Sequence, residues 1–275
     1  MSLSMQSMLF VPGSKPDRFA KALASGADCV CIDLEDAVPA GEKADARAAA
    51  LTAVAALGDP RLAIRINSVM TRAGLADLIA LAEAAVRPAL LFLPMVEAAQ
   101  EVAQVRTILA DPAIGLVPLI ETVAGLRAAD AIAADPGTVM LMFGGGDFSA
   151  QLGVALAWEP LAAARAQLVM AAAGANKPAL DVPFIHMDDA AGLAEECRRA
   201  KALGFAAKAA IHPAQIPVIH DIFRPTAADV AEAEAALAAF AAAGGRAIRH
   251  EGKMLEAPVV RRYEQILACK DNRDA

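Results

Sequence analysis

The sequence predicts a single (β/α)8 barrel, and three observations carry this prediction. The chain has 275 residues, and a barrel of this class takes roughly 250 residues as one domain. Short apolar runs alternate with longer Ala- and Leu-rich amphipathic runs, which is typical of βα units around a parallel sheet. Several short runs end in a charged or polar residue, although a buried parallel strand should be apolar throughout. In a barrel such residues meet at one open end, where the active sites of this fold form.

Eight runs are expected to form strands. They are Met8–Pro12, Cys29–Glu35, Leu62–Asn67, Ala89–Pro94, Gly115–Glu121, Val139–Phe143, Ala179–Phe184 and Ala207–Ile211. Helices are expected between them over Lys15–Ser25, Gly41–Ala56, Gly74–Ala85, Val96–Leu109, Ala124–Ala133, Leu161–Ala173 and Ala190–Leu203. An open doubly wound sheet is the alternative fold, but it needs a Gly-rich phosphate turn after the first strand. The residues at that place, Val11-Pro12-Gly13-Ser14, do not form such a turn.

The C-terminal part of the chain departs from the βα pattern. We expect the barrel to occupy residues 1–224, and a C-terminal helix and lid segment to occupy residues 225–275 of the same structural domain. Thr226 can cap an alanine-rich helix that stops at the Gly-Gly pair at 244–245. A polar segment at 249–258 and a final helix follow, and we expect this segment to be a lid or an oligomer contact.

Composition and charge argue against several classes of protein. The net charge is −7, whereas a nucleic-acid binder needs a basic face that releases counterions. No run of about 18 apolar residues is free of charges and breakers, so no membrane span is expected, and no signal peptide is apparent. The four cysteines, Cys29, Cys31, Cys197 and Cys269, are expected to be buried free thiols. This cysteine usage suits a reducing cytoplasm.

Polar residues at the strand ends are interpreted as an active site. They are Glu35, Asp36, Arg65, Asn67, Glu121, Asp147, Asp181 and His212. Glu121 and Asp147 end consecutive expected strands with no His or Cys beside them, and carboxylate oxygens alone favour Mg²⁺. The glycines at 144–146 let the backbone approach a ligand and leave N–H groups for an anion. The alternative is a capping carboxylate and an aspartate at a helix N-cap.

Arg65 stands in an apolar run near the end of the third expected strand. An arginine there needs a carboxylate partner. The partner is a substrate carboxylate, or Asp33 or Glu35 of the neighbouring strand, and both kinds of contact can hold together.

Three basic residues and one histidine complete the candidates. Lys15, Arg18 and Lys21 follow the first strand, where they form either a solvated helix face or a contact with phosphates at the barrel mouth. His212 precedes Pro213 at the end of the eighth strand. A structural role, a backbone contact with a ligand and proton transfer are all open for it.

Seven segments resemble the citrate lyase β-subunit family of the HpcH/HpaI aldolase-like superfamily, and they cover nearly the whole chain in the family's order. The segments are Leu9-Phe10-Val11-Pro12-Gly13, Asp33-Leu34-Glu35-Asp36-Ala37-Val38, Arg65-Ile66-Asn67, Leu119-Ile120-Glu121-Thr122, Gly145-Gly146-Asp147-Phe148, Gly204-Phe205-Ala206-Ala207-Lys208-Ala209-Ala210-Ile211-His212-Pro213 and Gly252-Lys253-Met254-Leu255-Glu256-Ala257-Pro258. Within the family, the chain is most similar to stand-alone citramalyl-CoA and malyl-CoA lyases. The resemblance implies a (β/α)8 barrel, usually assembled as a homotrimer.

The resemblance also implies roles for individual residues. It implies Mg²⁺ on Glu121 and Asp147, and a contact of Arg65 with the carboxylate or thioester region of the substrate. The family's lyases use a carboxylate in the C-terminal segment, often reaching into a neighbouring subunit's site, and that position falls on Glu256. The usual residue there is Asp, and Met95 stands where many relatives have Lys. The positions that match the acyl-carrier or CoA site are Phe10, Lys21, Ile211 and His212.

The expected function is Mg²⁺-dependent cleavage of a 3-hydroxy dicarboxylic acyl-CoA thioester, citramalyl-CoA or malyl-CoA, to a 2-oxo acid and acetyl-CoA. In this reaction Mg²⁺ is the Lewis acid and template, Arg65 stabilises developing charge, and Glu256 moves the proton as base or as acid. Three alternatives stay open. They are a citrate lyase β-subunit that works on an acyl carrier protein, a malyl-CoA thioesterase, and a non-catalytic metal-binding regulatory or scaffold protein.

Overall fold

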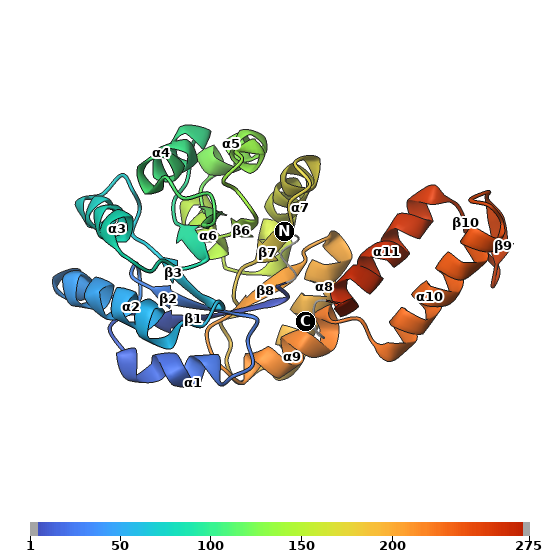
Figure 1. The fold of residues 1–275 in the computed structure, drawn as a ribbon, viewed down its shortest axis with the longest axis horizontal. Coiled ribbons are helices and arrows are strands. Elements are labelled where there is room, and N and C mark those ends of the chain that lie inside the picture. The colour runs from blue at the N-terminus through green and yellow to red at the C-terminus, as the bar shows by residue number, and fades with distance from the viewer. Residues whose placement is uncertain (1–4, 272–275) are drawn as a thin grey trace. The chain divides into compact units, whose positions relative to one another are not determined.

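Eight parallel strands close into a barrel in sequence order, with the helices around the ring of strands (Figure 1). The structure is a computed structural model that describes residues 5–271, with side chains described up to residue 268. The strands are β1 (Ser7–Pro12), β2 (Cys29–Asp33), β3 (Leu62–Arg65), β4 (Leu90–Leu93), β5 (Gly115–Ile120), β6 (Leu141–Phe143), β7 (Ala179–Asp181) and β8 (Ala207–Ala210). Pairing of β8 with β1 closes the ring. The predicted (β/α)8 barrel is confirmed, and the open sheet is excluded.

The helices keep the expected order, with one expected helix divided and two helices added, one after β6 and one after β8. They are η1 (Pro16–Arg18), α1 (Phe19–Leu23), η2 (Ala40–Glu42), α2 (Lys43–Leu57), α3 (Arg72–Glu83), α4 (Ala99–Leu109), α5 (Val123–Ala134), α6 (Gly145–Leu152), α7 (Trp158–Gly174), α8 (Ala190–Leu203) and α9 (Gln215–Phe223). The first expected helix is divided into a 3-10 turn and a short α-helix. Helix α6 was not expected, because it begins within three consecutive glycines, which have low helix propensity.

Side chains from alternate strand positions fill the barrel interior. The interior cluster includes Met8, Cys29, Cys31, Ala63, Phe92, Val117, Leu119, Met142, Leu180 and Ala209. Strand side chains alternate between two faces, so the same face of β2, β3 and β5 continues to Asp33, Arg65 and Glu121 at the carboxyl ends. Alternation therefore turns these three polar side chains inward, above the apolar interior.

The cysteines in the described part of the chain are buried free thiols, as expected. Cys29, Cys31 and Cys197 are all buried. Burial raises the pKa of the Cys29 thiol to about 12, and the negative charge of Asp28 adds to this effect. The side chain of Cys269 lies outside the described residues.

The chain divides into two compact units, one that ends at Asp221 and one that begins at Ile222. The second unit contains α10 (Ala227–Ala242), β9 (Ile248–His250), β10 (Lys253–Leu255) and α11 (Ala257–Asp271). Thr226 caps α10 through a capping box with Asp229, which confirms the predicted cap. The polar segment forms a hairpin whose turn contains Gly252 at φ +81°. Whether the two units form one structural domain stays a prediction.

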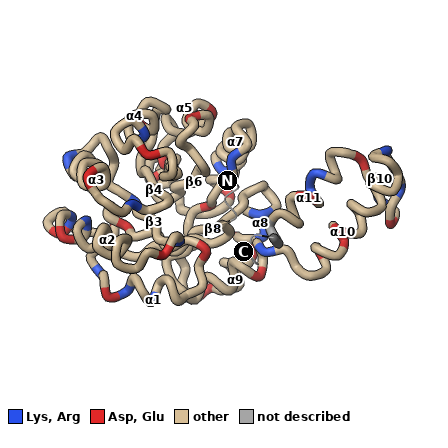
Figure 2. Tube along the Cα trace, viewed as in Figure 1, with Lys and Arg blue, Asp and Glu red and all other residues tan. Residues whose placement is uncertain are grey.

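Both units carry acidic and basic residues (Figure 2). None of the helices between residues 5 and 271 combines the length and hydropathy required to span a lipid bilayer.

Candidate functional site

Arg65 and Asp33 lie side by side at the carboxyl ends of β3 and β2. They are partners in the sheet register, and both side chains are buried. Arg65 Nε donates to Asp33 Oδ1 at 2.7 Å, and Nη2 donates to Oδ2 at 2.8 Å. This two-point contact fixes the orientation of the guanidinium. Of the two kinds of partner that the sequence left open for Arg65, the carboxylate within the protein is present.

Three further groups surround the Arg65 guanidinium. Glu35 Oε2 lies 2.8 Å from Nη1, the Asp36 carboxylate lies 3.9 Å from Nη2, and the Phe10 ring faces Cζ at 4.7 Å. Burial alone would lower the pKa of Arg65, but the hydrogen bonds and negative charge of Asp33 raise it above its ordinary value. Arg65 is therefore a permanent cation beside an aromatic ring.

Glu35 differs from Asp33 because its charge is poorly compensated. Burial raises the pKa of Glu35 to about 8, against the lowering effect of Arg65, and the negative charge of Glu121 raises it further. The side-chain oxygen nearest Arg65 accepts no hydrogen bond of good geometry. At neutral pH the Glu35 carboxyl group is therefore largely protonated, and the mouth holds more carboxyl groups than Arg65 can keep charged.

A polar network supports the loops after β2 and β3. Lys43, the first residue of α2, donates from Nζ to the carbonyl oxygens of Leu34 at 3.0 Å and Glu35 at 2.9 Å. It also donates to Asn67 Oδ1 at 2.5 Å. Asn67 Nδ2 donates in turn to Asp77 Oδ2 at 2.6 Å, and Asp77 is fully buried on α3. The network ties the loop that carries Glu35 to the strand that carries Arg65.

Glu121 directly follows β5 and is only 4% exposed. The backbone N–H of Met95, after β4, donates to Glu121 Oε2 at 2.7 Å. Burial raises the pKa of Glu121 to about 7, although the charge of Arg65 and the Met95 hydrogen bond lower it. The negative charge of Asp147 raises the pKa of Glu121 further. The two predicted metal ligands are therefore electrostatically coupled.

Asp147 stands in the first turn of α6, three residues after Gly144. Gly144 is the N-cap and provides no side-chain hydrogen bond, so Asp147 is not the N-cap aspartate of the alternative interpretation. Its side chain is exposed, in contrast to Glu121. The first N–H groups of a helix have no acceptor within the helix, and the helix dipole favours negative charge there. This turn therefore presents both a carboxylate and N–H donors.

The donor chemistry at Glu121 and Asp147 fits a hard cation. Burial penalises the charged form of Glu121, and a cation would offset that penalty. Over residues 5–268, no three or more His, Cys, Asp and Glu side chains are grouped closely enough to hold a metal ion alone. An ion here would take its other ligands from water or substrate, which is the way Mg²⁺ binds through one or two carboxylates.

The predicted CoA-site residues lie around β8 and β1, whereas the Lys43 network lies after β2 and β3. Leu9 pairs with Ala210 across the two strands, so Phe10 and Ile211 are the next residues on neighbouring strands. Ile211 and His212 are exposed, and the backbone N–H of Ile211 donates to Gln215 Oε1 at 2.9 Å. His212 Nδ1 accepts the N–H of Ala214 at 3.2 Å. Lys21 is exposed in the last turn of α1.

The expectation that Asp181 lines the mouth is wrong. Its neighbour Leu180 faces the barrel interior, so Asp181 faces the opposite side of β7. There Lys208 Nζ donates to Asp181 Oδ2 at 2.7 Å, and Arg165 Nε donates to Oδ1 at 2.8 Å. All three side chains are fully buried or nearly so. They form an ion network between the strands and the surrounding helices, and the mouth does not include it.

Glu256, the predicted catalytic carboxylate, lies in the second unit. Its side chain is exposed, and its carbonyl oxygen accepts the N–H groups of Val259 at 2.9 Å and Val260 at 3.0 Å at the start of α11. Its catalytic role, and the homotrimer in which it would act, stay predictions.

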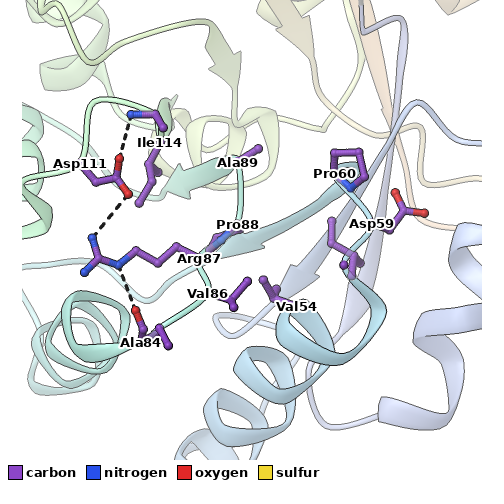
Figure 3. Close-up of a pocket in the computed structure, with 14 residues that line it drawn as sticks. Val54, Asp59, Pro60, Ala84, Val86, Arg87, Pro88, Ala89, Asp111 and Ile114 are labelled. Carbon is purple, nitrogen blue, oxygen red and sulfur yellow. Dashed lines mark hydrogen bonds and ion pairs between the residues drawn. The ribbon is translucent and has the colours of Figure 1, made fainter. Parts of the chain in front are cut away.

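A groove of about 450 Å³ lies at the other end of the barrel (Figure 3). Pro60, Ala89 and Ile114 line it, and each precedes a strand, so the groove is at the amino ends of β3, β4 and β5. Arg87 beside it pairs with Asp111 at 3.6 Å and donates to three backbone carbonyl oxygens. Its charge is used within the protein, and active sites of this fold form at the opposite end.

Four residues around the site were not identified from the sequence: Lys43, Asp77, Met95 as a backbone donor, and Gly144 as a neighbour of Glu121. Asp77 carried a signal, because it lies on the apolar face of its helix with the buried Leu78 and Leu81, and a carboxylate on that face needs a partner. Lys43 carried none, because a lysine at the start of an amphipathic helix is ordinary.

The sequence is similar to known proteins along most of its length. Residues 6–213 match the HpcH/HpaI aldolase/citrate lyase family. The citrate lyase subunit beta-like protein of Mycobacterium tuberculosis strain H37Rv is 37% identical over 267 residues, with 94% of this chain and 93% of the relative covered. The mitochondrial citramalyl-CoA lyase of Homo sapiens is 30% identical over 283 residues, with 94% and 83% covered. A (3S)-malyl-CoA thioesterase of Cereibacter sphaeroides strain ATCC 17029 is 33% identical over 239 residues, with 86% and 82% covered.

A solved structure extends the comparison to three dimensions. The crystal structure of CitE from Mycobacterium tuberculosis in complex with magnesium, acetoacetate and coenzyme A has a TM-score of 0.82 and 34% identity, and 98% of this chain and 99% of that chain are covered. The matched residues 6–213 contain all eight strands together with Arg65, Glu121 and Asp147. The resemblance found in the sequence is confirmed, as is the enzyme class of lyases. The chain belongs to the HpcH/HpaI aldolase/citrate lyase family.

Proposed function

We propose that this protein is a Mg²⁺-dependent lyase that cleaves a 3-hydroxy dicarboxylic acyl-CoA, citramalyl-CoA or malyl-CoA, to a 2-oxo acid and acetyl-CoA. One observation carries the proposal: the buried, poorly compensated carboxylate of Glu121 lies beside a permanently charged Arg65 at the carboxyl ends of the strands. The family supports it, since one relative is a citramalyl-CoA lyase and another was crystallised with magnesium, acetoacetate and coenzyme A.

Glu121 and Asp147 are the residues that would hold the ion. When bound, Mg²⁺ supplies Lewis acidity and a template for the hydroxyl and carboxylate oxygens of the substrate. Glu121 is already deprived of water by burial, so its carboxylate binds a cation with little further desolvation. The exposed Asp147, in the first turn of α6, would provide the second carboxylate ligand.

Arg65 holds the substrate and stabilises negative charge. A guanidinium has five N–H donors, and the hydrogen bonds to Asp33 use two of them. Donors remain on both Nη atoms for a substrate carboxylate or thioester oxygen. Asp33 keeps the fork from rotating, so little reorganisation is needed when charge develops in the reaction.

The N-terminal turn of α6 supplies a second place for an anion. The N–H groups of Gly145 and Gly146 are in the first turn, where a helix offers unsatisfied donors and a favourable dipole. The carboxylate next to the substrate's hydroxyl carbon fits this turn, because Asp147 of the same turn belongs to the proposed metal site.

Proton transfer is assigned to Glu256 of the second unit. A base removes the proton of the substrate hydroxyl, whose oxygen becomes the carbonyl of the 2-oxo acid. The electrons of the broken C–C bond pass to the α-carbon of the acetyl thioester, which then takes up a proton. Action in a neighbouring subunit of a homotrimer belongs to this proposal. Phe10, Lys21, Ile211 and His212 are assigned to the CoA side of the site.

The test is product analysis with the purified full chain, Mg²⁺ and each of citramalyl-CoA and malyl-CoA. We expect pyruvate or glyoxylate to appear together with acetyl-CoA, and treatment with a chelator to stop the reaction. Absence of a 2-oxo acid from both substrates would overturn the proposal.

Thioester hydrolysis is the second candidate, because a relative is a (3S)-malyl-CoA thioesterase. The same assay separates the two reactions, since hydrolysis releases free malate and CoA and no glyoxylate. A citrate lyase β-subunit, suggested by the name of the Mycobacterium relative, would act only when the thioester is carried on an acyl carrier protein.

A further inference from the structure

Glu121 and Gly144 meet where β5 and β6 end. Ile120 pairs with Phe143 in the sheet, so Glu121 and Gly144 are the next residues on both strands. The N–H of Gly144 donates to the carbonyl oxygen of Ile120 at 3.0 Å, which holds the two backbones together beyond the last strand pair. The Glu121 side chain passes directly over Gly144.

The three heavy atoms nearest to a Cβ built on Gly144 all belong to the Glu121 side chain. A Cβ atom on Gly144 would overlap Glu121 Cγ and would lie 2.5 Å from Oε1 and 2.7 Å from Cδ. Real Cβ atoms are essentially never within 3.0 Å of such neighbours. The backbone itself does not demand glycine, because φ is −95° and ψ is 72°, outside the left-handed region. Space for Glu121 is therefore the reason for glycine at this position.

Met95 constrains the same carboxylate from the strand on the other side of β5. Its N–H donates to Oε2 at 2.7 Å, and it does so from φ +56°, a left-handed conformation that is unfavourable for a residue with a Cβ. Glu121 Oε2 accepts the Met95 N–H, and Glu121 Oε1 lies over Gly144. Because Glu121 is 4% exposed, the side chain has little room to move elsewhere.

We propose that Gly144 is a positioning residue that keeps Glu121 in its metal-binding position. This inference rests on the proposed function, in which Glu121 is a metal ligand. A side chain at 144 would push the carboxylate off the Met95 N–H or displace the start of α6, which carries Asp147. Either movement changes the spacing of the two carboxylates, and Mg²⁺ demands near-ideal octahedral geometry with short bonds.

The chain provides a matched control two residues later. Gly146 lies in the same turn of α6, and a Cβ added there meets no atom within 4 Å. Gly144→Ala and Gly146→Ala both add one methyl group to the same turn. Only the methyl group at 144 collides with Glu121.

The experiment measures Mn²⁺ binding to the full chain without substrate, by calorimetry or by the electron spin resonance of free Mn²⁺. We expect Gly144→Ala to weaken Mn²⁺ binding at least about tenfold, as loss of support around metal ligands does, and Gly146→Ala to change it less than about twofold. Unchanged binding in Gly144→Ala overturns the inference. If Glu121→Ala itself retains Mn²⁺ affinity, the metal assignment fails and the inference fails with it.

A thermal stability cycle keeps the inference testable if Gly144→Ala folds poorly. We expect Gly144→Ala to lower the melting temperature in the wild-type background and to have little effect in a Glu121→Ala background, where the collision is gone. Equal destabilisation in both backgrounds overturns the inference, because the added methyl group would then act through another neighbour. This result does not depend on a bound metal.

Discussion

Replacing Asp33 with Asn tests whether the buried pair with Arg65 organises the mouth. The substitution keeps the shape of the side chain but removes the charge that accepts two Arg65 hydrogen bonds at 2.7 and 2.8 Å. Asp33 also accepts the backbone N–H groups of Glu35 and Ala37. Removing one partner of a buried ion pair costs about 3–5 kcal/mol. We expect about 3 kcal/mol, at the lower end of that range, because Glu35 remains 2.8 Å from Nη1.

The assay is urea or thermal unfolding followed by circular dichroism, and the surface pair of Asp59 and Arg61 provides the control. Arg61 Nε and Nη2 contact Asp59 with the same two-point geometry, at 3.0 and 2.7 Å, but both side chains are partly exposed. Asp59→Asn should cost no more than about 1 kcal/mol. For a unit of this size, Asp33→Asn should lower the melting temperature by roughly 6–12 °C. Equal effects of the two variants would refute the reasoning, because burial would then not decide the value of the pair.

Three further predictions follow from the burial and charge of single residues. Burial raises the pKa of Glu121 to about 7, so the metal-free site holds a proton below this pH, and a cation must displace it. Calorimetry should find Mn²⁺ affinity falling as the pH drops below about 7 and level above it; affinity independent of pH would contradict the assigned pKa. Asp147→Ala should abolish Mg²⁺ binding, because it removes one of the two proposed ligands, and unchanged affinity would contradict the metal assignment. The same substitution should change the free energy of unfolding by less than about 0.5 kcal/mol, because Asp147 is exposed. Cys29, Cys31 and Cys197 are buried, so peptide mapping should find them alkylated by iodoacetamide only after denaturation, and rapid labelling of the native protein would contradict that burial.

The barrel was predictable because its signals are periodic and repeated. Each strand is a short apolar run, and each is followed by a helix pattern, so small errors at the ends of elements did not affect the fold. Three strands end two or three residues earlier than expected, at Asp33, Arg65 and Asp181.

The site was predictable only in part, because strand ends alone do not say which way a side chain points. Arg65 and Glu121 share the parity of interior residues, whereas Asp181 has the opposite parity and joins Lys208 outside the barrel interior. The alternation of side chains along a strand could have separated Asp181 from Arg65 and Glu121, because Leu180, the neighbour of Asp181, is apolar and faces the barrel interior. The contact of Gly144 with Glu121 has no sequence signal, because it arises from the register of two separate strands.

The mouth gathers several local departures from the rules that stabilise folds. Glu121 is buried and Glu35 is half-buried, desolvation raises their pKa values to about 7 and about 8, and Met95 holds a left-handed conformation. Parallel strands selected for stability alone would end in apolar residues, so departures concentrated in one place indicate function. Because burial disfavours the charged form of these carboxyl groups and their donor atoms are oxygens, a hard cation stabilises that form. Because Arg65 keeps unused N–H donors, the same place also accepts an anion. A divalent cation together with an anionic, oxygen-rich substrate satisfies both demands at once, and that pairing is what cleavage of a 3-hydroxy dicarboxylic thioester requires.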